Sequence, residues 1–586
     1  MITRFKISKV TWPLAATMLA WLLPVFAWAP LTYPGYFEFH SGFLPIFNLN
    51  DLMRHLADLG WMPTVGQPYD VLRGEGALAY RLVALLRLLG ASSVAAVKWT
   101  FGISLLAGAL GMYGWTRRRL GPWPALLASM VYTYWPILLS AIYVRGALAE
   151  AVLMGLAPWV LWAADVAATG SWRGAVGLAL GLAAALRTQA GLALWLAAVV
   201  LAYILLVPYH LTSPREREAD GEDPPHPPPP QQVATAGVIF APHRGSAKSQ
   251  LKPTGLALIG WAAGLALGGL GLVPAVLQHG FGNVTYVSFA DHFVYPFQLL
   301  LAGWGAGPSI PGPNDTLTFS LGIIAFGLSV LGIILFREGA RSQARAGDGV
   351  YPPALRHTHT LFALATVLII AALSTTLAAF LWKWLPFLAR PLTYPWQLLL
   401  LAGPWLAWLA GLGGRALLDL WPEEGRQRWA VPLVAGLLTI TLIGAYGVLN
   451  PPTTSVPVPD APVAIFGDDQ IALLNAVTSG APGPGGRVTL LTRWQALRPI
   501  NQDYTVFFHA VGPDGSRWGQ QDTMPQNGKL PTSRWQPGQV IQDEYQIILA
   551  ADAPVSSDYR YLLGLYEWQT GERLTSGADD KVVLTP

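Results

Sequence analysis

Two ionisable residues stand close together in a stretch of sequence that is otherwise apolar. The segment from Tyr143 to Glu150 contains Arg145 and Glu150, and it joins two apolar runs. An unpaired charge beside hydrocarbon costs on the order of several kcal/mol. We therefore expect the two side chains to pair with each other, with another loop or with an anionic substrate. A purely structural ion pair is the alternative.

Two further regions combine charged residues with residue types that are common in binding sites. One is the long loop at residues 31–94, and the other runs from Trp382 to Gln397, where Arg390 lies among aromatic residues and prolines. The charged and titratable residues of the first region are Glu38, His40, Asp51, His55, Asp58, Asp70, Arg73 and Glu75. The alternatives are a solvated loop for the first region and an aromatic anchor at the membrane interface for the second.

Several common catalytic motifs are missing from the sequence. It contains no Walker loop, no HExxH, no G-x-S-x-G and no cluster of metal ligands. The absence of cysteine excludes disulfides, thiolate catalysis and cysteine-ligated metals. We therefore assign no residue as a metal ligand and no cofactor with certainty, and a requirement for a divalent metal stays open.

The composition requires lipid as the solvent for much of the chain. Hydrophobic residues make up 53% of the 586 residues and charged residues only 12%, which is about half the charged share of a soluble domain. The net charge of +4 is no sign of nucleic-acid binding, because membrane proteins collect Lys and Arg in their cytoplasmic loops.

The elements that must position these residues are mostly transmembrane helices. Residues 172–186 form a shorter run, which we interpret as a hairpin arm that turns at 187–189, with a re-entrant segment as the alternative. Residues 77–89 mix arginines with leucines, which predicts a helix at the interface. The first span resembles a signal peptide, but its length favours an uncleaved helix. Runs long enough to cross a core of about 30 Å lie at roughly 12–30, 95–115, 122–143, 148–168, 190–208, 254–278, 317–336, 358–382, 393–413 and 430–449.

The charges of the loops predict the orientation of about eleven helices. The outer loop 279–316 has no Lys or Arg. The N-terminus is then cytoplasmic and the C-terminal region lies outside the cytoplasmic (inner) membrane. The predicted cytoplasmic loops, all of which carry basic residues, are 117–119, 173, 209–253, 337–356 and 415–428.

Two regions differ from the helical runs. The loop 209–253 contains the sequence DPPHPPPP and is predicted to be disordered. After residue 452, runs of alternating apolar residues are separated by turn signals, which predicts an antiparallel β-sandwich. We therefore predict a transmembrane domain at 1–452 and an extracytoplasmic β-sandwich at 453–586.

Six short segments occur in a characteristic order along residues 35–415. They are Phe39-His40-Ser41-Gly42, Tyr143 to Glu150, Phe297-Gln298-Leu299, Gly303-Trp304-Gly305, Trp384-Leu385-Pro386 and Tyr394-Pro395-Trp396-Gln397. In these segments the chain resembles the GT-C superfamily of integral membrane glycosyltransferases, and within it the bacterial group named 6-pyruvoyl-tetrahydropterin-synthase-related membrane proteins. The end of the chain resembles the β-sandwich often appended to related proteins, in residues 490–494, 503–509 and 531–535.

The resemblance implies a reaction in which a sugar on a polyprenyl phosphate is transferred to a glycan or protein acceptor outside the cytoplasm. A carboxylate of the first loop acts as base, and cations stabilise the leaving phosphate. In this chain the base would be Glu38 or Asp51, with His40 positioning. The residues expected to bind substrate are Arg145, Glu150, Arg187, Arg390, Trp396 and Gln397.

The sequence departs from the family where its base is expected. The family has His-Asp-Gly followed by a second His and an Arg, whereas this chain has His40-Ser41-Gly42, Pro45 and Asn48. Either another carboxylate replaces the base, or the protein is a non-catalytic scaffold or accessory subunit of a cell-envelope membrane complex. A lipid or polysaccharide transporter is a third hypothesis, which needs charges near the membrane midplane.

Overall fold

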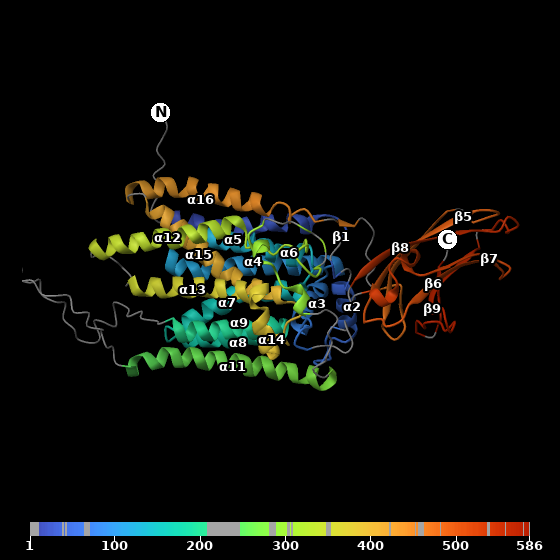
Figure 1. Cartoon of the computed structure of the whole chain (residues 1–586), viewed down its shortest axis with the longest axis horizontal. Helices are drawn as coiled ribbons and strands as arrows, with labels where there is room; N and C mark the ends of the chain where they lie inside the picture. The colour runs from blue at the N-terminus through green and yellow to red at the C-terminus, as the bar shows by residue number, and fades with distance from the viewer. Residues whose placement is uncertain are drawn as a thin grey trace, which may run out of the picture.

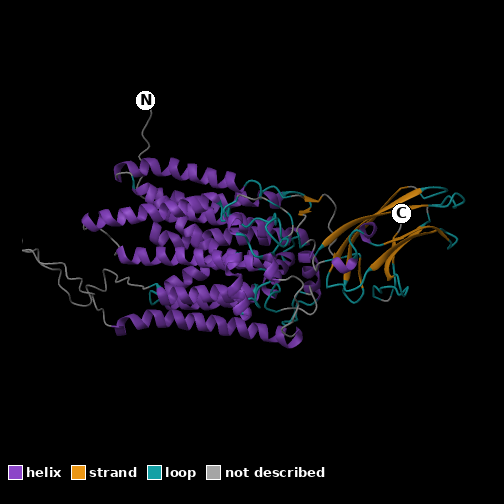
Figure 2. Cartoon of the chain, in the orientation of Figure 1, coloured by secondary structure: helices purple, strands orange, loops and turns teal. Residues whose placement is uncertain are grey.

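Most of the chain forms a bundle of roughly parallel helices, and a β-rich domain lies at one end of it (Figure 1). The loops between the helices collect mainly at that same end (Figure 2). The structure is a computed structural model that describes residues 11–37, 40–41, 44–63, 71–207, 247–279, 289–301, 305, 307, 309–346, 353–420, 423–451, 453–454, 462–480, 482–535, 539–556, 558–577 and 579–584.

Each apolar run predicted from the sequence contains at least one helix. Among the described residues, five helices are long and apolar enough to cross a membrane, or six if α5 and α6, bent by 43°, form one broken span. The chain is a multi-pass membrane protein, and the count of about eleven spans stays a prediction. The helices that lie within the apolar runs and the hairpin are α1 (Thr11–Leu22), α4 (Ser93–Leu120), α5 (Pro122–Thr133), α6 (Pro136–Tyr143), α7 (Leu148–Ala167), α8 (Trp172–Thr188), α9 (Ala190–Leu206), α11 (Ala247–His279), α12 (Ile323–Ala346), α13 (Pro353–Ser374), α15 (Leu399–Asp419) and α16 (Glu423–Ala445).

Two boundaries differ from the prediction. Helix α11 begins at Ala247, inside the loop that we predicted to be disordered, and residues 209–246 of that loop lie outside the described residues. Helix α13 ends at Ser374 instead of continuing to 382. At the break the Val294 amide donates a hydrogen bond to the Ser374 carbonyl, and the Val294 carbonyl accepts one from the Thr376 amide, both at 3.0 Å. The chain then forms the short helix α14 (Ala379–Trp384).

Helices α8 and α9 form the predicted hairpin. The carbonyl of Thr188, at the end of α8, accepts a hydrogen bond from the Gly76 amide at 2.7 Å. Gly191, at the start of α9, packs so closely against another loop that a Cβ atom there would lie 1.7 Å from the Pro391 carbonyl oxygen. Both contacts are with loops at the sandwich end of the bundle. The chain therefore reverses there, between two helices of 17 residues each.

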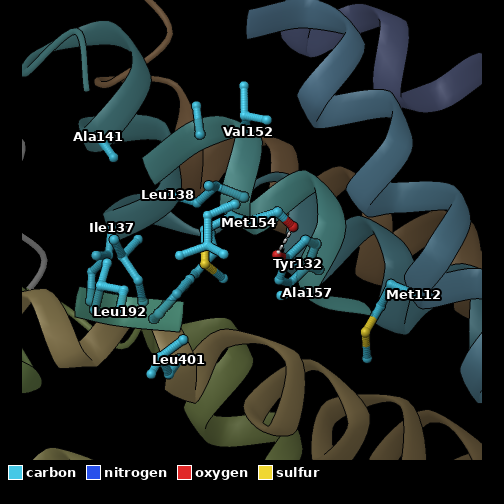
Figure 3. Packing of buried hydrophobic residues seen from close by; sticks show 14 of the residues in the cluster. Met112, Tyr132, Ile137, Leu138, Ala141, Val152, Met154, Ala157, Leu192 and Leu401 are labelled. Carbon is cyan, nitrogen blue, oxygen red and sulfur yellow. Dashed lines mark hydrogen bonds between the residues drawn. The ribbon is translucent and has the colours of Figure 1, made fainter. Parts of the chain in front are cut away.

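Close helix packing holds the bundle together. Gly332 of α12 faces Gly413 of α15, where a Cβ atom would lie 2.1 Å from a backbone oxygen of α12; small residues permit such approaches between membrane helices. Figure 3 shows a nearby part of the core, in which the Tyr132 hydroxyl donates to the Met154 carbonyl at 2.6 Å. This bond satisfies a buried hydroxyl that would otherwise be costly in a low-dielectric core.

The C-terminal region is an antiparallel β-sandwich, as predicted. Its two sheets have the strand orders β3-β4-β5-β8 and β10-β9-β6-β7. Alternate residues of β5 and β8, such as Trp494 and Tyr545, point into a core between the sheets. The strands are β3 (Ala464–Phe466), β4 (Ile471–Gly480), β5 (Arg487–Ala496), β6 (Tyr504–Val511), β7 (Arg517–Thr523), β8 (Val540–Ile548), β9 (Arg560–Glu567) and β10 (Val582–Leu584).

The sandwich is joined to the bundle by more than its linker. Strand β2 (Thr453–Thr454) does not enter the sandwich but pairs with β1 (Tyr36–Phe37) of the first loop. In addition, Ala472, Leu474 and Leu497 belong to the continuous buried cluster of the bundle and not to the sandwich core. One face of the sandwich is therefore buried against the loops of the bundle.

The orientation of the bundle in the membrane can be tested with reporters. Arg118 and Arg119, at the end of α4 away from the sandwich, pair with Asp165, and a basic end is expected to be cytoplasmic. A reporter that functions only outside the cytoplasm should be active after Pro586 and inactive near Pro228. The opposite result at either position would reverse the topology.

Candidate functional site

Residues from three segments meet at the sandwich end of the bundle. The guanidinium of Arg145 donates two hydrogen bonds to Glu150, one of them at 2.9 Å. The amide of Gln397 donates to the same carboxylate at 2.7 Å, and the Trp396 ring lies 4.5 Å from the guanidinium carbon. The side chains of Arg145 and Glu150 are only 17% and 6% exposed. A buried fork of this geometry is suited to binding an oxyanion.

The backbone around Arg145 is fixed by the first loop. Gly146 has a φ of 62°, a conformation in which a side chain is strained. In this conformation the Gly146 carbonyl accepts a hydrogen bond from the Ser41 hydroxyl at 3.2 Å. The amides of His40 and Ser41 donate to the carbonyls of Val144 and Arg145, at 3.0 and 3.2 Å. The segment that carries Arg145 is thus held by main-chain contacts to residues 40–41.

A second carboxylate, Glu75, lies beside this cluster. It accepts hydrogen bonds from the Tyr80 hydroxyl at 2.5 Å and from the Ala149 amide, in the first turn of α7, at 3.3 Å. Asn48 in turn donates to Tyr80 at 3.2 Å. Asn48 occupies the position at which the resembled family has an arginine. The side chains that hold the Glu75 carboxylate here, Tyr80 and through it Asn48, are neutral.

The position of Glu75 depends on the glycine that follows it. A Cβ atom on Gly76 would lie 2.1 Å from the Arg187 carbonyl oxygen, so only glycine permits the loop to approach the end of α8. The next residue begins α3 (Ala77–Leu88), the helix predicted at the interface. We did not select Glu75 from the sequence, where the one signal was a carboxylate between two glycines directly before an amphipathic helix.

Burial raises the pKa of Glu75, and the negative charge of Glu150 raises it further. The hydrogen bonds from Tyr80 and Ala149 and the charge of Arg145 oppose this rise without cancelling it. The residue keeps some exposed surface, although its carboxylate is surrounded by protein groups. Arg145 is hydrogen-bonded to Glu150 and acts on Glu75 through its charge, and the raised pKa suits Glu75 to holding a proton.

Trp396 is held by a short motif that occurs twice. Residues 295–299 and 394–398 have the same pattern, Tyr-Pro-aromatic-Gln-Leu, and each forms a 3-10 turn in which the Gln side chain accepts from the Tyr amide. In the first copy Gln298 donates to the Asp315 carbonyl, and Asp315 binds Ser309. Ser309 accepts from the Trp396 indole at 3.2 Å. The repeat can be read in the sequence, but we did not recognise it there.

Of the other predicted site residues, those that the structure describes make contacts elsewhere, and one is not described. Asp51 accepts a hydrogen bond from the Trp61 indole at 2.7 Å, and Glu38 lies outside the described residues. The side chain of Arg390 is exposed, while its carbonyl accepts from Arg73 at 2.8 Å. Arg187 is partly buried and lies over Gly271 of α11. Their predicted roles stay predictions.

The described residues contain no group of three or more His, Asp or Glu side chains that could hold a metal ion. A separate polar groove of about 380 Å³ lies on the sandwich, lined mainly by β8 residues 542–544 and by Gln526, Asn527 and Lys529. It is shallow and has no aromatic side chain in its lining. The cluster around Arg145 is thus the stronger candidate for a reactive site.

Neither a protein-family model nor a curated protein matches the sequence. Nine chains of solved structures are similar to this chain, and two of them are as follows. ArnT from Cupriavidus metallidurans, bound to undecaprenyl phosphate, has 12% identity and a TM-score of 0.41, over 75% of this chain and 76% of ArnT. The arabinofuranosyltransferase AftD from mycobacteria has 16% identity and a TM-score of 0.38, over 76% of this chain and 27% of AftD.

This chain spans about a quarter of the length of AftD. Because both TM-scores are below 0.5, the chemistry of the site is inferred from its own residues.

Proposed function

We propose that the chain is a membrane glycosyltransferase that uses a sugar carried on a polyprenyl phosphate, at the sandwich end of the bundle. The observation that supports this most directly is the convergence of Arg145, Glu150 and Glu75 beside Trp396 and Gln397. It supplies a cation for a phosphate and a separate carboxylate that can hold a proton. Both groups lie where the bundle meets the solvent-exposed domain.

In the proposed reaction, Glu75 accepts the proton of an acceptor hydroxyl, directly or through Tyr80. The acceptor oxygen forms a bond to the anomeric carbon of the sugar. The bond between that carbon and the phosphate oxygen breaks, and its electron pair leaves with the polyprenyl phosphate. Arg145 stabilises the negative charge of the leaving phosphate, and Glu150, Gln397 and Trp396 orient Arg145. Glu38 and Asp51 are the alternative bases.

A second candidate function is favoured by the closed geometry of the ion pair. Arg145 already makes two hydrogen bonds to Glu150, so the pair also fits a structural role in a non-catalytic scaffold. The two functions differ in one property. In a transferase, Arg145 must give up part of its hydrogen bonding to Glu150 in order to bind an incoming phosphate, whereas in a scaffold the ion pair can stay closed.

Binding of undecaprenyl phosphate tests the proposed function. The full chain in lipid nanodiscs should bind this lipid more tightly than undecaprenol, which has the same tail without the phosphate. Arg145→Lys keeps the charge but loses the planar fork, and we expect about tenfold weaker binding. Arg173→Ala, an exposed cation in the first turn of α8 at the other end of the bundle, is the matched control and should bind normally.

Two results would reject this function. One is a wild-type protein that binds undecaprenyl phosphate no better than undecaprenol. The other is an Arg145→Lys variant with unchanged affinity, since the phosphate would then be bound elsewhere.

A further inference from the structure

Ser41 occupies the position at which the resembled family has the Asp of its His-Asp-Gly motif, and its contacts point to a different role. Its hydroxyl donates to the Gly146 carbonyl and its amide donates to the Arg145 carbonyl. An ionised carboxylate at this position has no proton to donate to the Gly146 carbonyl oxygen and would face it with like charge. The residue is therefore a hydrogen-bonded support of the segment that carries Arg145.

The remaining polar group of the Ser41 backbone is bound by the sandwich. The amide nitrogen of Gln495, on β5, donates to the Ser41 carbonyl at 3.0 Å. Gln495 is fully buried, and it points away from the sandwich core, since its neighbour Trp494 points into that core. The Ser41 carbonyl also accepts a hydrogen bond from the Leu44 amide at 3.1 Å. The buried bond from Gln495 is a second, directional restraint on the same carbonyl, and it is the one that comes from the sandwich.

The same interface has an apolar part and a strand part. Ala472 and Leu474 of β4, together with Leu497, are buried in the cluster of the bundle, and β2 pairs with β1 just before residues 40–41. The first loop is thus held between the sandwich on one side and the Arg145 segment on the other. Residues 40–41 thus connect the sandwich to the Arg145 segment through hydrogen bonds on both sides.

We propose that the β-sandwich contributes to the site. Gln495, acting through Ser41, is a positioning residue that fixes the position of Arg145 for binding its phosphate ligand. This proposal rests on the proposed function for the identity of the ligand. The coupling between Gln495 and the Arg145 segment does not rest on it, and the two can be measured separately.

The variant Gln495→Met conserves the volume of the side chain but removes the donor. Gln520→Ala is the matched control, because Gln520 is exposed on β7 of the other sheet. Hydrogen exchange of the full chain in nanodiscs should show amides at 40–41 and in 143–147 exchanging at least about tenfold faster in Gln495→Met. Peptides from β6 in the sandwich core should be unchanged, and so should all peptides of Gln520→Ala.

The same samples are titrated with undecaprenyl phosphate. We expect Gln495→Met to bind it about fivefold more weakly than wild type, the effect of one lost buried hydrogen bond, and Gln520→Ala to bind it normally. Unchanged exchange at 40–41 and 143–147 in Gln495→Met would overturn the proposal, as would faster exchange with unchanged affinity. Faster exchange in a protein whose wild type binds no lipid phosphate would support the coupling and reject the proposed function instead.

Discussion

Glu75→Gln should lower the rate of sugar transfer by about 10²–10⁴-fold, the usual contribution of a positioned base. The substitution preserves the shape of the side chain, and the new amide can accept from Ala149 and donate to Tyr80 in the observed geometry. Binding of undecaprenyl phosphate should be retained, because Arg145 is untouched. The measurement is conversion of polyprenyl-phosphate sugars from a native lipid extract to polyprenyl phosphate, followed by mass spectrometry.

The difference in stability between Glu75→Gln and the wild type should change with pH in a defined direction. Burial raises the pKa of Glu75 in the folded protein, so the folded state binds the proton more tightly than the unfolded chain does. The stability gained from that proton is fully present below the unfolded pKa of about 4.3 and is lost as the pH rises through the folded pKa. Glu75→Gln should therefore equal the wild type near pH 4 and be at least as stable at pH 8.

Two control variants separate Glu75 from the bases expected from the family resemblance. Asp51→Asn and Glu38→Gln should leave the transfer rate within a few-fold of wild type if Glu75 is the base. If one of them instead abolishes transfer while Glu75→Gln is active, the base has been assigned to the wrong carboxylate. If all three variants are active, the site does not use a carboxylate base.

The hydropathy pattern was sufficient to place the helices because each must satisfy its own backbone hydrogen bonds in lipid. The β-sandwich was also predictable, since strands such as β8 alternate strictly between buried and exposed residues. The break in α13 was not. The sequence is apolar before Ser374 and again from Leu377, with two threonines between. The helix ends because Val294, about 80 residues away in sequence, offers a competing backbone pairing.

The candidate site was predictable only in part for a similar reason. Arg145 and Glu150 are near each other in sequence, and a charge beside hydrocarbon is conspicuous. Glu75 was one of many charged residues in the first loop, and it was distinguished only when the packing of Gly76 against Arg187 brought it to the start of α7. The link from Gln495 to Ser41 joins residues more than 450 positions apart, and no local pattern encodes it.

Arg145→Ala should destabilise the protein by about 3–5 kcal/mol, because it leaves Glu150 buried without its cation. Glu150→Gln should also destabilise the protein, since Arg145 then loses its counter-charge. The measurement is unfolding in detergent, followed for wild type, the single variants and the charge reversal Arg145→Glu with Glu150→Arg. A double-mutant cycle of this kind isolates the interaction between the two side chains.

The surroundings of the pair are asymmetric, and this decides what the reversal can restore. A glutamate at position 145 would face the electron-rich ring of Trp396, whereas an arginine at 150 would lie beside the donor amide of Gln397. We therefore expect the reversal to recover only part of the lost stability, with Glu75 as a new partner for the cation. It should recover none of the affinity for undecaprenyl phosphate, because a phosphate needs the cation at position 145. Recovery of both would show that the pair has a structural role only and that the phosphate is bound elsewhere, which would reject the proposed role of Arg145.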